Sequence, residues 1–149
     1  MLAPLEVGIC CADLDRLVQF YVELLPCELV SVIDVPASKA RQAAVSRSAY
    51  RVARIQLATG ERIKFLEPRE PPKSPAPAAT ILEERGTSYL TFIVDDLAKI
   101  LDRLEQHKLE VLSGARPVEV RPGVSLVFAR DPEHNLIEFV RYDDLASYR

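Results

Sequence analysis

Alternating apolar and polar positions near the start of the chain predict a short strand that leads into an amphipathic helix. In residues 5–11, Glu6 and Cys10 fall on one face of the strand, opposite the apolar side chains. Asp13 follows as the expected N-cap of the helix, and apolar residues then recur at helical spacing until Pro26 ends it. A strand followed by a helix is therefore the predicted start of the fold.

Three more strands complete the first half of the chain in this prediction. They cover residues 28–35, 51–58 and 62–67, and a tight turn at Thr59-Gly60 separates the last two. The intervening residues 36–49 are mostly small and polar, and we expect a loop or flap there.

A proline-rich segment separates two similar halves. Residues 68–79 contain five prolines, a density that excludes a helix or a central strand and predicts a semi-rigid linker over residues 68–86. Beyond the linker, residues 89–97 repeat the pattern of residues 6–14, including the aspartate before the helix. The remaining strands of this half are predicted at residues 109–112, 124–129 and 136–141.

The repeat predicts two βαβββ modules, residues 1–67 and 87–142, within a single α+β domain of 149 residues. We expect each helix to cover one face of its own sheet. The two sheets would then curl in a pair around a central cup. Side chains on the sheet faces opposite the helices would line that cup.

Composition and charge narrow the classes of partner. The formal net charge is −3 and there is no basic stripe, so nucleic acid and anionic membranes are not expected partners. No apolar run approaches the roughly 18 residues that span a bilayer, and the first residues do not resemble a signal peptide. We therefore expect a cytoplasmic protein. The three cysteines lack metal-type spacing and are expected to be reduced, and both histidines, His107 and His134, fall outside the cup-facing strand positions.

Four segments carry a resemblance to a known superfamily and together span nearly the whole chain. They are LEVGICCADLDRLVQFYVELL, RIKFLEP, YLTFIVDDLAKILDRLE and FARDPEHNLIEFV. The chain resembles the vicinal oxygen chelate superfamily, which includes glyoxalase I, methylmalonyl-CoA epimerase, extradiol dioxygenases and bleomycin-resistance proteins. The resemblance implies the glyoxalase-like paired-sheet fold. It also implies a homodimer, because many members pair through their sheet edges.

For the metal-dependent members, the resemblance implies one divalent ion in the cup, held from four equivalent strand positions. These positions carry Glu6, Lys64, Tyr89 and Glu138 in this chain. Only Glu138 is the family's commonest residue at its place, and the Lys64 ammonium has no lone pair to give to a metal. We therefore favour no metal or other cofactor. If a divalent metal binds, Glu6 and Glu138 are its expected ligands.

Our main hypothesis is that the Lys64 ammonium replaces the ion, and three functions remain open. The favoured one is a metal-independent cup that binds a small organic ligand, neutral or anionic, as bleomycin-resistance-type members do. The second is a lyase, isomerase or epimerase for a small carbonyl or carboxylate compound. In it Glu6 or Glu138 would be the base, Tyr89 a proton donor and Lys64 the group that stabilises developing charge. The third is a metal enzyme with Glu6 and Glu138 as ligands, with or without Tyr89, and with Lys64 turned aside.

A structural role and further ligand contacts complete the predictions for the cup. The four polar residues could form a buried salt-bridge network without any ligand, although four polar side chains are costly core filling. We expect Cys10, Arg51 and Arg54 to contact the ligand. Cations in the loop 36–49 would form a rim that favours a carboxylate or phosphate, and a solvated loop without a binding role is the alternative.

Overall fold

The computed structural model describes residues 3–73, 81 and 85–148, and these residues form two compact units. The units are Met1–Pro75 and Ala76–Arg149, and each is described by itself. Most of the predicted linker lies outside the described residues, so its extended conformation stays a prediction.

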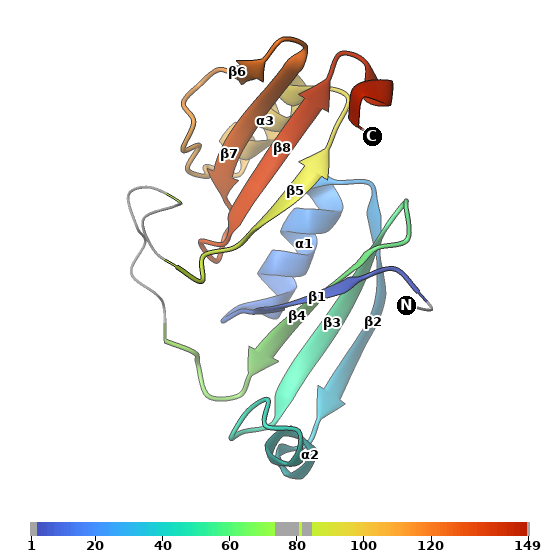
Figure 1. The fold of residues 1–149 in the computed structure, drawn as a ribbon. Coiled ribbons are helices and arrows are strands. Elements are labelled where there is room, and N and C mark those ends of the chain that lie inside the picture. Colours follow the sequence, from blue (N-terminus) through green and yellow to red (C-terminus); the bar gives the residue numbers. More distant parts are fainter. Residues whose placement is uncertain (1–2, 74–80, 82–84, 149) are drawn as a thin grey trace. The chain divides into compact units, whose positions relative to one another are not determined.

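The first unit is a four-stranded sheet with one long helix on one face (Figure 1). Its strand order is β1-β4-β3-β2; β1 pairs in parallel with β4, and the other pairs are antiparallel. The elements are β1 (Glu6–Cys10), α1 (Leu14–Leu24), β2 (Cys27–Val35), α2 (Ala37–Gln42), β3 (Tyr50–Leu57) and β4 (Arg62–Pro68).

Helix α1 forms where the sequence predicts it, for the predicted reasons. The Asp13 side chain accepts a hydrogen bond from the Arg16 backbone N–H at 3.0 Å, which satisfies one free donor of the first turn. The buried face of α1 packs on the sheet, and the Tyr21 ring lies 5.0 Å from the Phe65 ring of β4. Both aromatic side chains are fully buried, so this contact lies at the centre of the first core.

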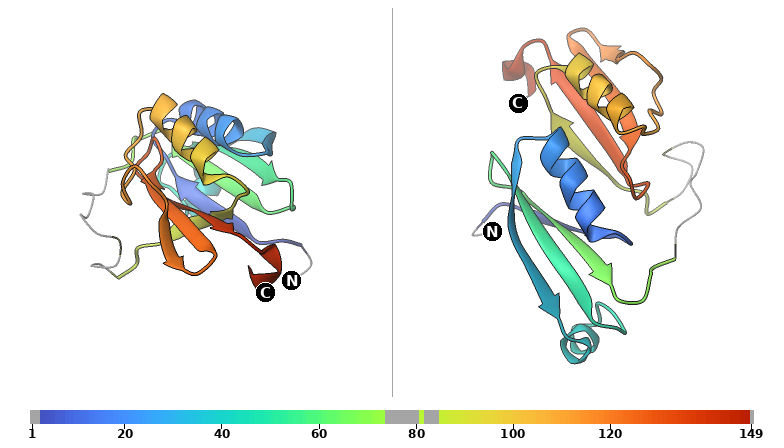
Figure 2. Two further views of the ribbon diagram at one scale, coloured as in Figure 1. Left: turned by 90° about the horizontal axis from the view of Figure 1, so that it is seen from above. Right: turned by 180° about the vertical axis from the view of Figure 1, so that it is seen from behind.

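The second unit repeats the same topology. Its strand order is β5-β8-β7-β6, with β5 parallel to β8 and the other pairs antiparallel. Figure 2 shows α1 and α3 each lying on one face of its own sheet. The elements are β5 (Tyr89–Ile93), α3 (Leu97–Gln106), β6 (Val118–Arg121), β7 (Val124–Arg130), β8 (Leu136–Tyr142) and a short 3-10 helix, η1 (Leu145–Tyr148). The predicted repeat of two βαβββ modules is confirmed.

Two local predictions differ from the structure. The segment 36–49 is not all loop, because α2 forms in it from residues with good helix propensity, mainly alanine, lysine, arginine and glutamine. The strand expected at 109–112 is reduced to one isolated bridge between Val111 and Ala129, and the edge strand is β6 instead.

No helix of the described residues is long and apolar enough to cross a membrane.

Candidate functional site

The face of the first sheet that lies opposite α1 carries a charged cluster. Pleating places Lys64 and Arg54 on this face as cross-strand partners, and Glu6 and Cys10 project from β1 on the same side. The Lys64 Nζ atom lies 3.2 Å from Glu6 Oε2. The structure therefore brings together the two predicted site residues of the first module.

Two arginines add positive charge around the Glu6 carboxylate. Arg62 Nη1 lies 3.5 Å from Glu6 Oε1, and Arg54 is near enough for its charge to act on the same group. The hydrogen bond from Lys64 is the largest cause that holds the pKa of Glu6 below its ordinary value; the charges of Lys64 and Arg54 and a hydrogen bond from Arg62 act in the same direction, and partial desolvation opposes them. Glu6 is thus held as a carboxylate among three cations.

Arg51 lies on the other face of the sheet. Its Nε atom donates to Glu67 Oε2 at 2.7 Å, and its Nη2 atom donates to Asp15 Oδ2 of α1 at 3.0 Å. Glu67 Oε1 also accepts from the Leu14 backbone N–H at 3.0 Å, so this network fixes the start of α1 to the sheet. The structure does not place Arg51 with Arg54, and we leave Arg51 out of the candidate site.

The predicted cationic rim makes local contacts in the structure. Lys39 Nζ lies 3.4 Å from Gln42 Oε1, and Arg41 Nη1 donates to the Arg47 backbone carbonyl at 3.3 Å. The role of this segment in ligand binding stays a prediction.

The face of the second sheet opposite α3 carries Glu138 and Tyr89. Glu138 is 8% exposed, and its Oε2 atom accepts a hydrogen bond from the Thr91 hydroxyl at 2.6 Å. The Tyr89 ring makes an edge contact with the Phe128 ring, with 5.1 Å between centroids, and Phe128 is the cross-strand partner of Glu138. Tyr89 and Glu138 therefore occupy the same face of one sheet, and Thr91, the cross-strand partner of Glu138, follows Tyr89 on that face of β5.

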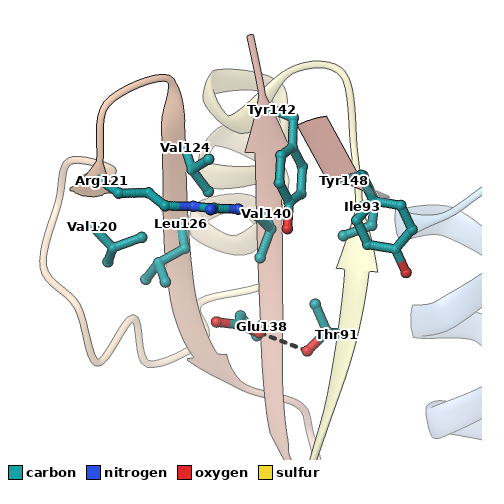
Figure 3. Close-up of a pocket in the computed structure, with 10 residues that line it drawn as sticks. All are labelled: Thr91, Ile93, Val120, Arg121, Val124, Leu126, Glu138, Val140, Tyr142 and Tyr148. Atoms are coloured by element: carbon teal, nitrogen blue, oxygen red, sulfur yellow. Dashed lines mark hydrogen bonds between the residues drawn. The ribbon is translucent and has the colours of Figure 1, made fainter. Parts of the chain in front are cut away.

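A hollow of about 290 Å³ opens on this face above Glu138 (Figure 3). Its described lining residues all belong to the second unit, and Glu138 and Thr91 form one end of it. Arg121 reaches across it from β6 toward Val140, while Tyr142 and Tyr148 stand at the end remote from Glu138. The other lining residues are apolar: Ile93, Val120, Val124 and Leu126.

Sequence reasoning missed Arg121, Tyr142 and Tyr148, because it assigned no element to residues 113–123 and saw no signal in the last residues. A signal was present for β6: Val118 and Val120 alternate with charged residues, and Pro122-Gly123 follows as a turn before the next strand. Gly123 has a φ of 75°, so this turn needs a residue that tolerates the left-handed region.

The two histidines lie where the sequence predicts them. His107 is the C-cap residue of α3, and its backbone N–H bonds the Arg103 carbonyl at 3.0 Å. His134 occupies the turn before β8 with a φ of 65°, a position at which glycine is more usual. Neither residue lines the hollow.

Comparison with known proteins identifies the family. The family model described as "Glyoxalase/Bleomycin resistance protein/Dioxygenase superfamily" matches residues 4–139. The chain belongs to this superfamily. A curated relative, the glyoxalase domain-containing protein RDO1 of Mycosarcoma maydis, is 27% identical over 139 residues, which cover 91% of this chain. The chain spans only 66% of that relative's own length.

Solved structures of glyoxalase-superfamily proteins share the fold. A glyoxalase family protein from Bacillus cereus has a TM-score of 0.80 and 22% identity, with 95% of each chain covered. The trypanothione-dependent glyoxalase I of Leishmania major has a TM-score of 0.69 and 17% identity, with 97% of this chain and 89% of that chain covered. A glyoxalase I mutant from Zea mays has a TM-score of 0.70 and 20% identity, and this chain covers 46% of it.

The donor set in the first unit does not fit the divalent ion that the superfamily resemblance implies. Both oxygens of Glu6 are contacted by cations, Lys64 at 3.2 Å and Arg62 at 3.5 Å, and a metal bound there would be repelled by both. Within the part of the chain that the structure describes, no group of three or more His, Cys, Asp or Glu side chains could hold a metal ion. We therefore derive no chemistry through a metal for this chain.

Proposed function

We propose that this chain is a metal-independent member of the glyoxalase superfamily that binds a small organic ligand on the polar faces of its sheets. The observation that carries the proposal is the 3.2 Å contact between Lys64 Nζ and Glu6 Oε2. These residues occupy two of the positions that the resemblance assigns to metal ligands. The ammonium group supplies at this place the positive charge that an ion would supply, and it needs no metal ligands to hold it.

The charge balance of the first face supports an anionic ligand. Lys64, Arg62 and Arg54 act on the single carboxylate of Glu6, so this cluster has a surplus of positive charge. Lys64 and Arg62 are partly exposed, with 31% and 40% of their side chains accessible. Their remaining N–H donors are available to a carboxylate or phosphate on the ligand.

Two measurements on the purified protein test this proposal together. Elemental analysis follows incubation with Zn, Mn, Fe, Ni and Co, and we expect no metal at stoichiometric amount. Thermal unfolding with a panel of small carboxylates and aromatic compounds follows, and we expect at least one compound to raise the Tm. A stoichiometric ion would contradict the proposal, and so would a panel that leaves the Tm unchanged throughout.

A matched pair of lysine variants sharpens the ligand test. Lys64→Gln removes the ammonium beside Glu6, and we expect it to reduce the stabilisation by an anionic compound. Lys73→Gln removes an exposed lysine outside the cluster and is expected to leave that stabilisation unchanged. Equal effects of the two substitutions would show that Lys64 acts only through the overall charge of the protein.

A metal-independent lyase, isomerase or epimerase is the second candidate function. The hydrogen-bond partners of Glu6 and Glu138 favour Glu138 as its base. The hydrogen bond from Lys64 lowers the pKa of Glu6, which makes Glu6 a weaker base. Glu138 instead faces the hollow, with one oxygen bonded to Thr91 and the other directed away from Thr91 (Figure 3). In this candidate, Glu138→Gln abolishes turnover of a small carbonyl compound while the bound ligand still raises the Tm.

The convergence of Glu6 and Lys64 with Tyr89 and Glu138 stays a prediction. The first pair belongs to one unit and the second pair to the other. The proposals above are therefore argued from each sheet face by itself.

A further inference from the structure

We propose that the hollow above Glu138 takes an aromatic monocarboxylate, with its carboxylate on Arg121 and its ring against the apolar side chains of β7 and β8. This inference rests on the proposed ligand-binding function and adds to it the class of ligand and its orientation. Four features of the second unit support it: the availability of the Arg121 guanidinium to an anion, the aromatic end of the hollow, the Glu138 carboxylate at the opposite end, and the volume of the hollow.

Arg121 is available to an anion. Among the described residues, no carboxylate lies within 4.0 Å of its guanidinium, which lies over the Tyr142 ring at 5.9 Å from the centroid. A guanidinium that lies over an aromatic ring keeps the N–H groups along its edge free, and these match both oxygens of a carboxylate. The ring contact also restricts the side chain, so less entropy is lost when the anion binds.

Nearby carboxylates are engaged elsewhere. Glu119, two residues before Arg121, accepts a hydrogen bond at 3.2 Å from the backbone N–H of Gly123 in the β6–β7 turn. Asp143, whose backbone N–H bonds the Gly123 carbonyl at 2.9 Å, has its side chain paired with Arg141. The chain thus places acidic residues beside Arg121 in sequence and in space, but directs them to other partners.

The walls of the hollow suit a flat ring. Leu126 and Val140 come from the neighbouring strands β7 and β8 and lie under the Arg121 side chain, as Figure 3 shows. Tyr142 and Tyr148 make an edge contact with 5.4 Å between centroids, so the aromatic end is ordered by packing. Rings packed against such side chains gain from apolar burial and from edge or stacked contacts.

Glu138 determines the orientation of the bound ligand. Its carboxylate can only accept hydrogen bonds, and its negative charge repels a second anion. The ligand's carboxylate therefore lies at the Arg121 end, and a hydroxyl or amine on the far side of the ring meets Glu138. A volume of about 290 Å³ is at the small end of ligand pockets, which favours one ring over a nucleotide or a peptide.

The test uses the full chain and two probes of similar size and shape, the anion 4-hydroxybenzoate and its neutral amide, 4-hydroxybenzamide. Binding is measured by calorimetry or by ligand-observed NMR, with wild type, Arg121→Gln and the control Arg116→Gln, which removes an exposed arginine outside the hollow. We expect the wild type to prefer the acid. Arg121→Gln should weaken acid binding by about tenfold, the effect of one charge-assisted hydrogen bond, and leave amide binding unchanged. Arg116→Gln should change neither.

A second variant separates a binding effect from a folding effect. Tyr142→Leu keeps the hollow apolar but removes the ring beside Arg121, and we expect it to weaken both probes while the circular dichroism spectrum stays that of the wild type. Equal binding of acid and amide, or equal effects of the two arginine substitutions, would overturn the aromatic carboxylate but leave the proposed function intact. Failure of every small organic compound to bind would overturn the proposed function itself.

Discussion

The hydrogen bond between Thr91 and Glu138 offers a direct test of how the second face is built. Thr91→Val replaces the hydroxyl by a methyl group of similar size and keeps the β-branched shape that suits β5. The substitution leaves Glu138 Oε2 without the donor that now lies at 2.6 Å, and Glu138 is only 8% exposed. A hydrogen bond to a charged group contributes about 1.5–3 kcal/mol; we expect the lower end, about 1.5 kcal/mol, because water can reach the exposed Thr91 side.

Chemical unfolding followed by far-UV circular dichroism measures this loss, since the chain contains no tryptophan to report it by fluorescence. In thermal unfolding, the same loss should lower the Tm by about 3–6 °C for a chain of this size. Thr59→Val is the matched control, because the Thr59 hydroxyl also donates to a glutamate, Glu61, but in an exposed turn. We expect less than about 0.5 kcal/mol there. A loss at Thr91 no larger than the loss at Thr59 would refute the reasoning that Glu138 is a buried carboxylate supported by Thr91.

Three further predictions follow from the first unit. Phe65→Ala removes a fully buried ring that packs on Tyr21, and we expect a loss of about 3–5 kcal/mol in the free energy of unfolding; a loss below about 1 kcal/mol would contradict the described core. Because the pKa of Glu6 is lower in the folded protein than in the unfolded chain, the Glu6 carboxylate stabilises the fold at any pH above its unfolded pKa. This stabilisation is lost as the pH falls through the folded pKa. Lys64→Gln should therefore destabilise the protein at neutral pH but not at a pH below the folded pKa of Glu6, and a pH-independent difference would exclude this linkage. The edge strand β2 exposes Val32 by 46%, and if a homodimer forms through this edge, Val32→Lys should yield monomers in light scattering, whereas an unchanged mass would exclude pairing there.

The fold could be predicted from the sequence because its signals are local and repeated. Asp13 and Asp96 both accept hydrogen bonds from the first turns of their helices, as the repeated aspartate before each apolar helical pattern indicates. The parallel pairing of β1 with β4 recurs in β5 with β8, in the same order. The strand that the prediction missed, β6, has only four residues and all are exposed, so its signal is limited to two valines that alternate with charged residues before a Pro-Gly turn.

The candidate site could be predicted only in part, since side-chain partners depend on the tertiary structure. Glu6 and Lys64 were expected on one face, and they lie there as an ion pair. Arg51 and Arg54 are three residues apart in one strand, so alternation sends them to opposite faces, and only Arg54 lies with Lys64. The position of Arg121 depends on the β6–β7 hairpin, which Pro122-Gly123 indicates in the sequence. It also depends on the Tyr142 ring of β8, and no local sequence pattern connects that ring with Arg121.

The measurement that tests the central claim most directly is an NMR titration of the isotope-labelled protein with 4-hydroxybenzoate, which follows the backbone amides and the Arg121 Nε–H signal. The account predicts saturable shifts for Arg121, Thr91 and Glu138, the residues at the two ends of the hollow. It also predicts no shift along the outer face of α3. Saturable shifts that leave these three residues unchanged, or no shifts with this or any other small organic ligand, would contradict the claim that the second sheet face is a binding site.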